Sequence, residues 1–148
     1  WIFYISCCTF LYVVLVTLRR NFSVDYVIPF WITGLTGFHG HTYPGATAPF
    51  GAVQLSPDTR VGNWDACAGY HYNDTTLRGF SHTHLSGTGC IDLGDILFRP
   101  TTQEPSFTNE FFYSPANFSH QDEMASAGYY SVLLKDEGIK LNWRRPLM

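Results

Sequence analysis

Charge is scarce in this sequence, and clustered basic charge is missing altogether. Charged residues make up 14% of the 148 residues, and the formal net charge is -3. The 9 Lys and Arg residues form no long basic run. Proteins that hold nucleic acid neutralise several backbone phosphates with clustered Lys and Arg side chains. The composition therefore argues against nucleic acid as a partner.

Helical periodicity is also missing beyond Arg20, where we find no amphipathic helix and no internal repeat. The chain there consists of short apolar runs separated by Gly, Pro, Asn and Asp, and 17% of all residues are aromatic. This rhythm is typical of β structure. A chain of this length suits one domain better than two. We therefore predict a single all-β domain, an antiparallel β-sandwich.

A hairpin near the end of the chain is the clearest element of this domain. Residues 128–134 and 139–143 form its arms, and Ile139, Leu141 and Trp143 alternate with polar residues, as expected for a strand with one buried face. Three further strands are expected, at residues 50–55, 69–72 and 94–98. A turn at residues 56–58 is expected to end the first of them. Residues 101–127 show no period.

Residues 1–18 contain no charged side chain and are closed by Arg19 and Arg20. A helix of this length, at about 1.5 Å per residue, spans most of a bilayer core of roughly 30 Å. We predict that residues 1–20 form an apolar helical signal-anchor or transmembrane-like segment before the β-sandwich of residues 21–148. The protein would then be secreted, periplasmic or membrane-anchored, with membrane contact through residues 1–18. Translated non-coding sequence is the alternative.

Two of the four cysteines lie in the body of the predicted domain, Cys67 and Cys90. In an exported protein they are candidates for a disulfide, which would contribute about 3 kcal/mol on the chain-entropy model. Two separate thiols are the alternative.

Two His-x-His pairs raise the question of a metal site. His39 with His41, and His82 with His84, are spaced so that a strand would direct both imidazoles of a pair to one face. Imidazole suits zinc, so a zinc-dependent hydrolase is one hypothesis. The candidate carboxylate partners are Asp65, Asp92 and Asp95.

A nucleophilic serine is a weaker alternative. Ser81 and Ser86 lie close to histidines, but Thr83 stands where a G-x-S-x-G motif requires glycine.

The residue types around Trp64 fit a sugar site better. Trp64 and Tyr70 offer flat apolar faces, and Asp65 and His71 offer polar groups beside them. Sugars present C–H faces to aromatic rings and hydroxyls to carboxylates and imidazoles. An ordinary core tryptophan remains the alternative for Trp64.

Several segments between about Val24 and Trp143 follow one another in a distinctive order. The main ones are residues 39–46 (HGHTYPGA), 49–59 (PFGAVQLSPDT), 64–65 (WD), 69–72 (GYHY), 79–90 (GFSHTHLSGTGC), 94–97 (GDIL) and 128–132 (GYYSV). Together, and in this order, they resemble the N-terminal domain of glycoside hydrolase family 92, the family of inverting α-mannosidases.

The resemblance implies a β-sandwich of the supersandwich, galactose-mutarotase-like type, here incomplete at its C-terminal edge. In the family this domain packs against an (α/α)6 barrel, and the active site lies between the two. The barrel would supply the general acid, the general base and most ligands of a calcium ion, so we expect no catalytic residue and no metal ligand in this segment.

By the same resemblance, the segment would form one wall of a mannose site. Trp64 and Asp65 match the tryptophan-containing loop of the family and are the first candidates for sugar contact. The remaining candidates are His82, His84, His39 and His41. We therefore expect the carbohydrate-contacting part of a calcium-dependent exo-α-mannosidase acting on mannose-rich glycans, inactive without its partner barrel. A stand-alone, membrane-anchored lectin-like module is the alternative of a different class.

Overall fold

The computed structural model describes residues 28–35, 39–47, 52–87, 90, 92–104, 108 and 114–144. The apolar helical segment predicted for residues 1–20 lies outside the described residues. In the part that is described, no helix is both long and apolar enough to cross a membrane.

Short antiparallel strands form the described part of the chain, together with a few single-turn 3-10 helices. The strands are β1 (Ser56–Asp58), β2 (Thr76–Leu77), β3 (Gly79–Ser81), β4 (Ala116–Asn117), β5 (Met124–Ser126), β6 (Tyr129–Leu134) and β7 (Ile139–Arg144). The helices are η1 (Pro29–Thr33), η2 (Trp64–Ala66) and η3 (His120–Asp122). The predicted all-β class with antiparallel strands is confirmed.

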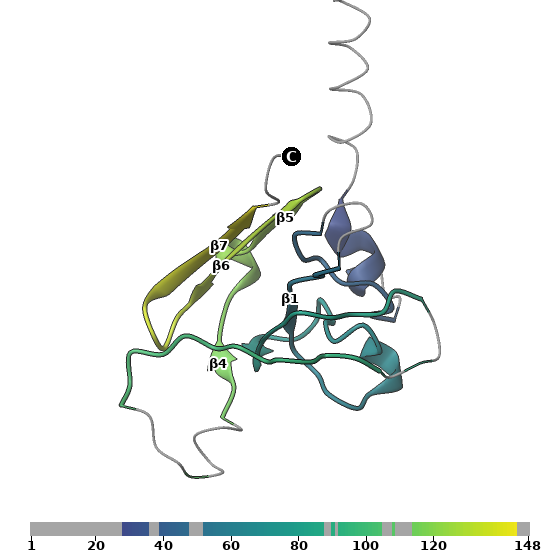
Figure 1. The fold of residues 1–148 in the computed structure, drawn as a ribbon. Coiled ribbons are helices and arrows are strands. Elements are labelled where there is room, and N and C mark those ends of the chain that lie inside the picture. The colour runs from purple at the N-terminus through teal and green to yellow at the C-terminus, as the bar shows by residue number, and fades with distance from the viewer. Residues whose placement is uncertain are drawn as a thin grey trace, which may run out of the picture.

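The strands pair in three small sheets. β1 pairs with β3, β2 pairs with β4, and β5, β6 and β7 form an antiparallel meander. In Figure 1 the meander forms the left flank of the molecule, and η1 lies to the right of β5. Among the described strands, β7 pairs with β6 alone, so its other edge is open to a further strand.

The predicted hairpin is confirmed. Val132 lies opposite Leu141 in its register, and the tight turn between the arms includes Gly138 with a φ of 65°. In β7 the half-buried Ile139, Leu141 and Trp143 alternate with exposed polar side chains, because successive residues of a strand face opposite sides.

The positions predicted for the other strands are wrong. The three residues expected to form a turn, 56–58, are the buried strand β1, and the described residues before them, 52–55, are not in a strand. Residues 69–72 form a loop. Residues 94–98 carry only an isolated bridge between Phe98 and Phe80. The prediction missed β4 and β5 in residues 101–127 because both are held by pairing with distant segments, which local pattern does not reveal.

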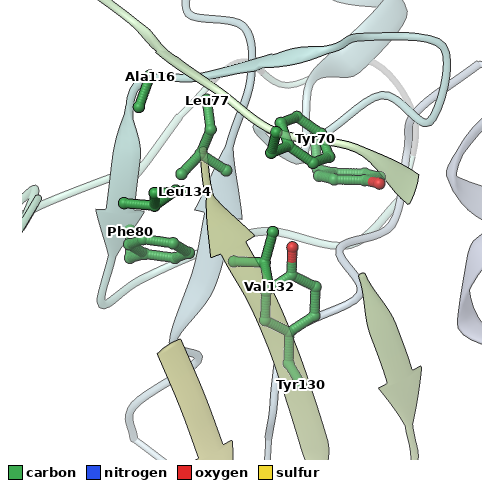
Figure 2. Close-up of a cluster of buried hydrophobic side chains, with 8 residues drawn as sticks. Tyr70, Leu77, Phe80, Ala116, Tyr130, Val132 and Leu134 are labelled. Carbon is green, nitrogen blue, oxygen red and sulfur yellow. The ribbon is translucent and has the colours of Figure 1, made fainter. Parts of the chain in front are cut away.

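The hydrophobic core lies where the meander covers the two smaller sheets. Tyr130, Val132 and Leu134 point inward from alternate positions of β6 and are fully buried. They meet Leu77 and Phe80, as Figure 2 shows. Burying a large apolar side chain contributes about 1.5–3 kcal/mol, so this contact fixes the meander on the rest of the fold.

One carboxylate is enclosed at the edge of this core. The side chain of Glu123 is fully buried and accepts hydrogen bonds from the hydroxyls of Tyr70, at 3.0 Å, and Tyr130, at 2.6 Å. His120 donates from Nδ1 to the same carboxylate at 2.6 Å. Burial, reinforced by the charge of Glu123, raises the pKa of both tyrosines well above the ordinary value.

Candidate functional site

A short helical turn presents Trp64 to solvent. Helix η2 begins after Asn63, whose side chain caps the turn by accepting a hydrogen bond from the backbone N–H of Asp65 at 2.9 Å. Ala66, on the inner side of the turn, is buried, while the Trp64 side chain is 49% exposed. Local capping therefore explains why an aromatic residue in this position faces outward.

The first His-x-His pair surrounds Trp64. The rings of His39 and His41 stack on each other with centroids 5.3 Å apart. Each ring centroid also lies 4.9 Å from that of Trp64, with the planes steeply inclined. His41 donates from Nε2 to the backbone carbonyl of Trp64 at 3.2 Å. His39 donates from Nδ1 to Oδ1 of Asp65 at 2.6 Å. We call these four residues, His39, His41, Trp64 and Asp65, the Trp64 cluster.

Gly40 is what allows the two segments of the cluster to meet. Its N–H donates to the carbonyl of Asp65, and its carbonyl accepts from the N–H of Ala68. A Cβ atom at position 40 would lie 2.2 Å from the carbonyl oxygen of Tyr70, far inside van der Waals contact. The glycine of the His-Gly-His motif is therefore required by close backbone approach.

The Trp64 cluster has the chemistry of a sugar-contacting surface. Trp64 offers an exposed indole, and about half of the side chains of His39 and Asp65 is also exposed. An indole stacks on the C–H face of a pyranose, and a carboxylate and imidazoles bind vicinal hydroxyls. The cluster contains no pair of carboxylates, so it can bind and orient a sugar but cannot supply the acid and base of glycoside hydrolysis.

The second His-x-His pair does not join this cluster through any contact among the described residues. His82 is half-buried and donates from Nδ1 to the carbonyl of Ile96 at 2.9 Å. His84 is buried, and both of its ring nitrogens face acceptors, the carbonyl of Gln54 at 2.7 Å and Oδ1 of Asp58 at 2.9 Å. His84 thus stabilises the fold through these two buried hydrogen bonds. Sugar contact by His82 or His84 stays a prediction.

The surroundings of His84 also bear on the nucleophilic alternative. Ser81 donates from Oγ to Oδ2 of Asp58 at 2.6 Å and lies 3.0 Å from Nε2 of His84. A hydrolytic triad needs its carboxylate and its serine on opposite nitrogens of the imidazole. Here both lie on the same nitrogen in a buried setting, and the geometry does not support a serine nucleophile.

Neither metal binding nor a disulfide is supported by the described part of the chain. Among its His, Cys, Asp and Glu side chains, no group of three or more is placed to hold a metal ion. The two histidine pairs therefore give the zinc hypothesis no support.

Cys67 and Cys90 are free thiols. Cys67 is buried and donates to the carbonyl of Gly87 at 3.0 Å, whereas Cys90 is exposed, so the structure has the alternative of separate thiols.

Comparison with known proteins identifies the family. The sequence profile of the Glycosyl hydrolase family 92 N-terminal domain matches residues 26–143. The chain belongs to glycoside hydrolase family 92. The resemblance seen in the sequence is thereby confirmed. A comparison with curated protein sequences gives no match.

The chain is similar to solved structures of family 92 enzymes along most of its own length. The α-mannosidase BT3965 from Bacteroides thetaiotaomicron, solved in complex with mannoimidazole, is 46% identical over 83% of the chain, with a TM-score of 0.72. The family 92 glycosyl hydrolase ccman5 is 33% identical over 83% of the chain, with a TM-score of 0.59. The inverting mannosidase BT2199 from Bacteroides thetaiotaomicron VPI-5482 is 25% identical over 80%, with a TM-score of 0.51. The chain spans only 16% of the length of each.

Sequence reasoning found the members of the Trp64 cluster but missed the groups that support the fold around it. The sequence predicts a turn at Asp58, whereas the structure makes it the buried partner of both Ser81 and His84. Glu123 carried no motif at all. The one available signal for Asp58 was the short Ser-Pro-Asp run between apolar residues, which is ambiguous between a turn and a buried strand.

Proposed function

We propose that this chain supplies the carbohydrate-contacting wall of an α-mannosidase. The observation that carries the proposal is the exposed Trp64 indole, which is held by His39 and His41 and lies next to Asp65. An exposed indole with a carboxylate and imidazoles at its rim matches a pyranose face and its hydroxyls.

The relatives support this assignment of substrate. BT3965 is an α-mannosidase and was solved with mannoimidazole, and it is the relative that shares 46% identity with this chain. BT2199 is an inverting mannosidase. We therefore propose a mannose residue of a mannose-rich glycan as the group that meets Trp64, and hydrolysis with inversion in the longer protein.

In this proposal the chain binds and orients, and the chemistry is carried by residues outside it. An inverting glycosidase needs one carboxylic acid on the leaving oxygen and a carboxylate that activates water on the opposite face. Asp65, the one carboxylate of the Trp64 cluster, is engaged with His39. We place the acid and base, with a barrel domain, in the part of the relatives' length that this chain does not span.

Calcium belongs to the same proposal. When bound, calcium would supply a hard cation for sugar hydroxyls. The described residues offer no group of three His, Cys, Asp or Glu side chains for a metal ion, so they do not fit such a site. We place the calcium ligands outside this chain, and no step of binding at Trp64 is assigned to the ion. Export, and membrane attachment through residues 1–18, are proposals that rest on the apolar sequence alone.

The test is sugar binding by the complete 148-residue chain. Isothermal titration with methyl α-mannoside should show saturable binding, and Trp64→Ala should weaken it at least tenfold. Trp31→Ala is the matched control, because Trp31 is also an exposed tryptophan but belongs to η1 and not to the Trp64 cluster. Equal binding by Trp64→Ala and the unaltered chain would contradict the proposed wall.

A second assay tests the division of labour. The chain should give no turnover of an aryl α-mannoside, with or without added calcium, because it lacks the acid and the base. Clear turnover by the purified chain would contradict the placement of the catalytic groups elsewhere.

A further inference from the structure

A hollow lies against the loop that carries the His-Gly-His motif. It has a volume of 310 Å³ and lies between the start of η1, residues 42–47 and the turn between β5 and β6. Five hydroxyl side chains line it: Thr42, Tyr43, Thr47, Ser86 and Ser126. Pro29 and Pro44 add apolar faces, and none of the described residues that line the hollow carries a formal charge at neutral pH. We call this hollow the hydroxyl pocket.

One hydroxyl of the pocket has no hydrogen-bond partner in the part of the chain that the structure describes. The Oγ1 atom of Thr47 is buried, yet it finds no partner among the described residues. A buried hydroxyl without a partner costs about 1–3 kcal/mol, and most buried polar atoms in native proteins are satisfied. Thr47 therefore marks a place where a bound group would complete the hydrogen bonding.

The hydroxyl pocket is physically tied to the Trp64 cluster. The N–H of Gly87, next to Ser86, donates to the carbonyl of His41 at 2.7 Å. Thr42 and Tyr43 directly follow His41 in the chain, and the Tyr43 ring packs 5.1 Å from the ring of His84. Residues 39–47 thus serve both places, His39 and His41 in the cluster and Thr42, Tyr43 and Thr47 in the pocket.

We propose that the hydroxyl pocket binds a second, neutral sugar residue of the glycan. This proposal rests on the function proposed for Trp64. Small-molecule sites typically occupy about 300–1,000 Å³, so the pocket has room for one sugar ring. Hydroxyl side chains both donate and accept, as the hydroxyls of a sugar require, and the prolines and the Tyr43 ring supply apolar contact. The lack of charge disfavours a phosphorylated or carboxylated ligand, whose charge would be left unpaired.

The test compares a monosaccharide with disaccharides on the complete 148-residue chain. By isothermal titration, at least one of a set of α-linked mannobioses should bind about tenfold more tightly than methyl α-mannoside. Thr47→Val removes the unpartnered hydroxyl with little change of shape, and it should abolish this preference while leaving monosaccharide affinity unchanged. Thr47→Ser should restore the preference.

Ser56→Ala is the matched control, because Ser56 Oγ is another buried hydroxyl without a partner among the described residues but is not one of the residues that line the pocket. It should keep the mannobiose preference. The pocket proposal is overturned if no mannobiose is preferred by the unaltered chain, or if Thr47→Val keeps the preference. Trp64→Ala separates the two proposals, since loss of monosaccharide binding in that variant concerns the Trp64 wall alone. If the unaltered chain binds neither sugar, both proposals fall.

Discussion

His39 donates a hydrogen bond from Nδ1 to Oδ1 of Asp65 at 2.6 Å, although the two residues are far apart in the sequence and both are about half exposed. The contact places two polar side chains beside Trp64, because Asp65 follows Trp64 and the His39 ring packs against the indole. A directed hydrogen bond of this kind fixes the ring orientation of a histidine and leaves its other nitrogen for a ligand.

Asp65→Asn tests whether that orientation matters. An amide has similar shape but no charge, so the bond to His39 weakens. We expect the affinity for methyl α-mannoside to fall about tenfold. The free energy of unfolding should change by no more than about 0.5 kcal/mol, because the pair is about half exposed. Isothermal titration and urea unfolding measure the two quantities, and a large loss of stability with unchanged affinity would show that the pair is structural.

The two members of the second His-x-His pair should respond differently to removal. His84→Ala takes away the donor to Oδ1 of the buried Asp58 carboxylate, which among the described residues keeps only its hydrogen bonds from Ser81 on Oδ2, and should lower the free energy of unfolding by about 3–5 kcal/mol. His82→Ala, the matched control, loses one hydrogen bond at a half-buried site and should cost about 1 kcal/mol. Urea unfolding followed by circular dichroism compares them. Equal losses would contradict the roles assigned here.

Glu123 is expected to be the most sensitive carboxylate of the described core. Glu123→Gln keeps the size of the side chain but removes the charge of the carboxylate, which accepts hydrogen bonds from Tyr70, Tyr130 and His120. We therefore expect the free energy of unfolding to fall by about 2–3 kcal/mol. Asp122→Asn, at the neighbouring exposed position, should change stability by less than about 0.5 kcal/mol. Urea unfolding of both variants at neutral pH makes the comparison.

Alkaline pH should weaken the fold through the same network. Burial raises the pKa of Tyr70 and Tyr130 above that of the unfolded chain, which is about 10. The folded state therefore keeps protons that the unfolded state loses, and the stabilisation is complete below about pH 10 and declines above it. Urea midpoints measured from pH 8 to pH 11 should fall steeply at the alkaline end. The fall should be shallower in Tyr130→Phe than in Tyr129→Phe, whose hydroxyl bonds Asn142 at the surface.

How much the sequence could predict depended on whether a feature was local. The alternation of Ile139, Leu141 and Trp143 identified β7 correctly because the period of a strand is written in consecutive residues. For Trp64 the sequence leaves both a sugar site and a core position open, and the structure places the side chain at the surface. By contrast, the His82 and His84 spacing suggested one shared face, but β3 ends at Ser81 and the chain turns His84 inward to Asp58.

Groups that act through distant contacts gave no local signal. Glu123 meets Tyr70 from a loop more than fifty residues away, and Thr47 becomes part of a pocket only when Ser126 is folded against it. A polar residue of this kind looks the same in sequence whether it faces water or a buried partner, because only the tertiary fold decides its burial.

The central claim is that Trp64 touches the sugar, and nuclear magnetic resonance of the tryptophan indoles tests it most directly. The 148-residue sequence contains four Trp residues, so a ¹⁵N-labelled chain gives a small set of indole N–H signals, and Trp64→Phe identifies that of Trp64. Adding methyl α-mannoside should shift the Trp64 signal saturably and leave that of Trp143, packed on Phe80 and Tyr130, unchanged. A Trp64 signal that does not move at sugar concentrations that saturate binding would contradict the account.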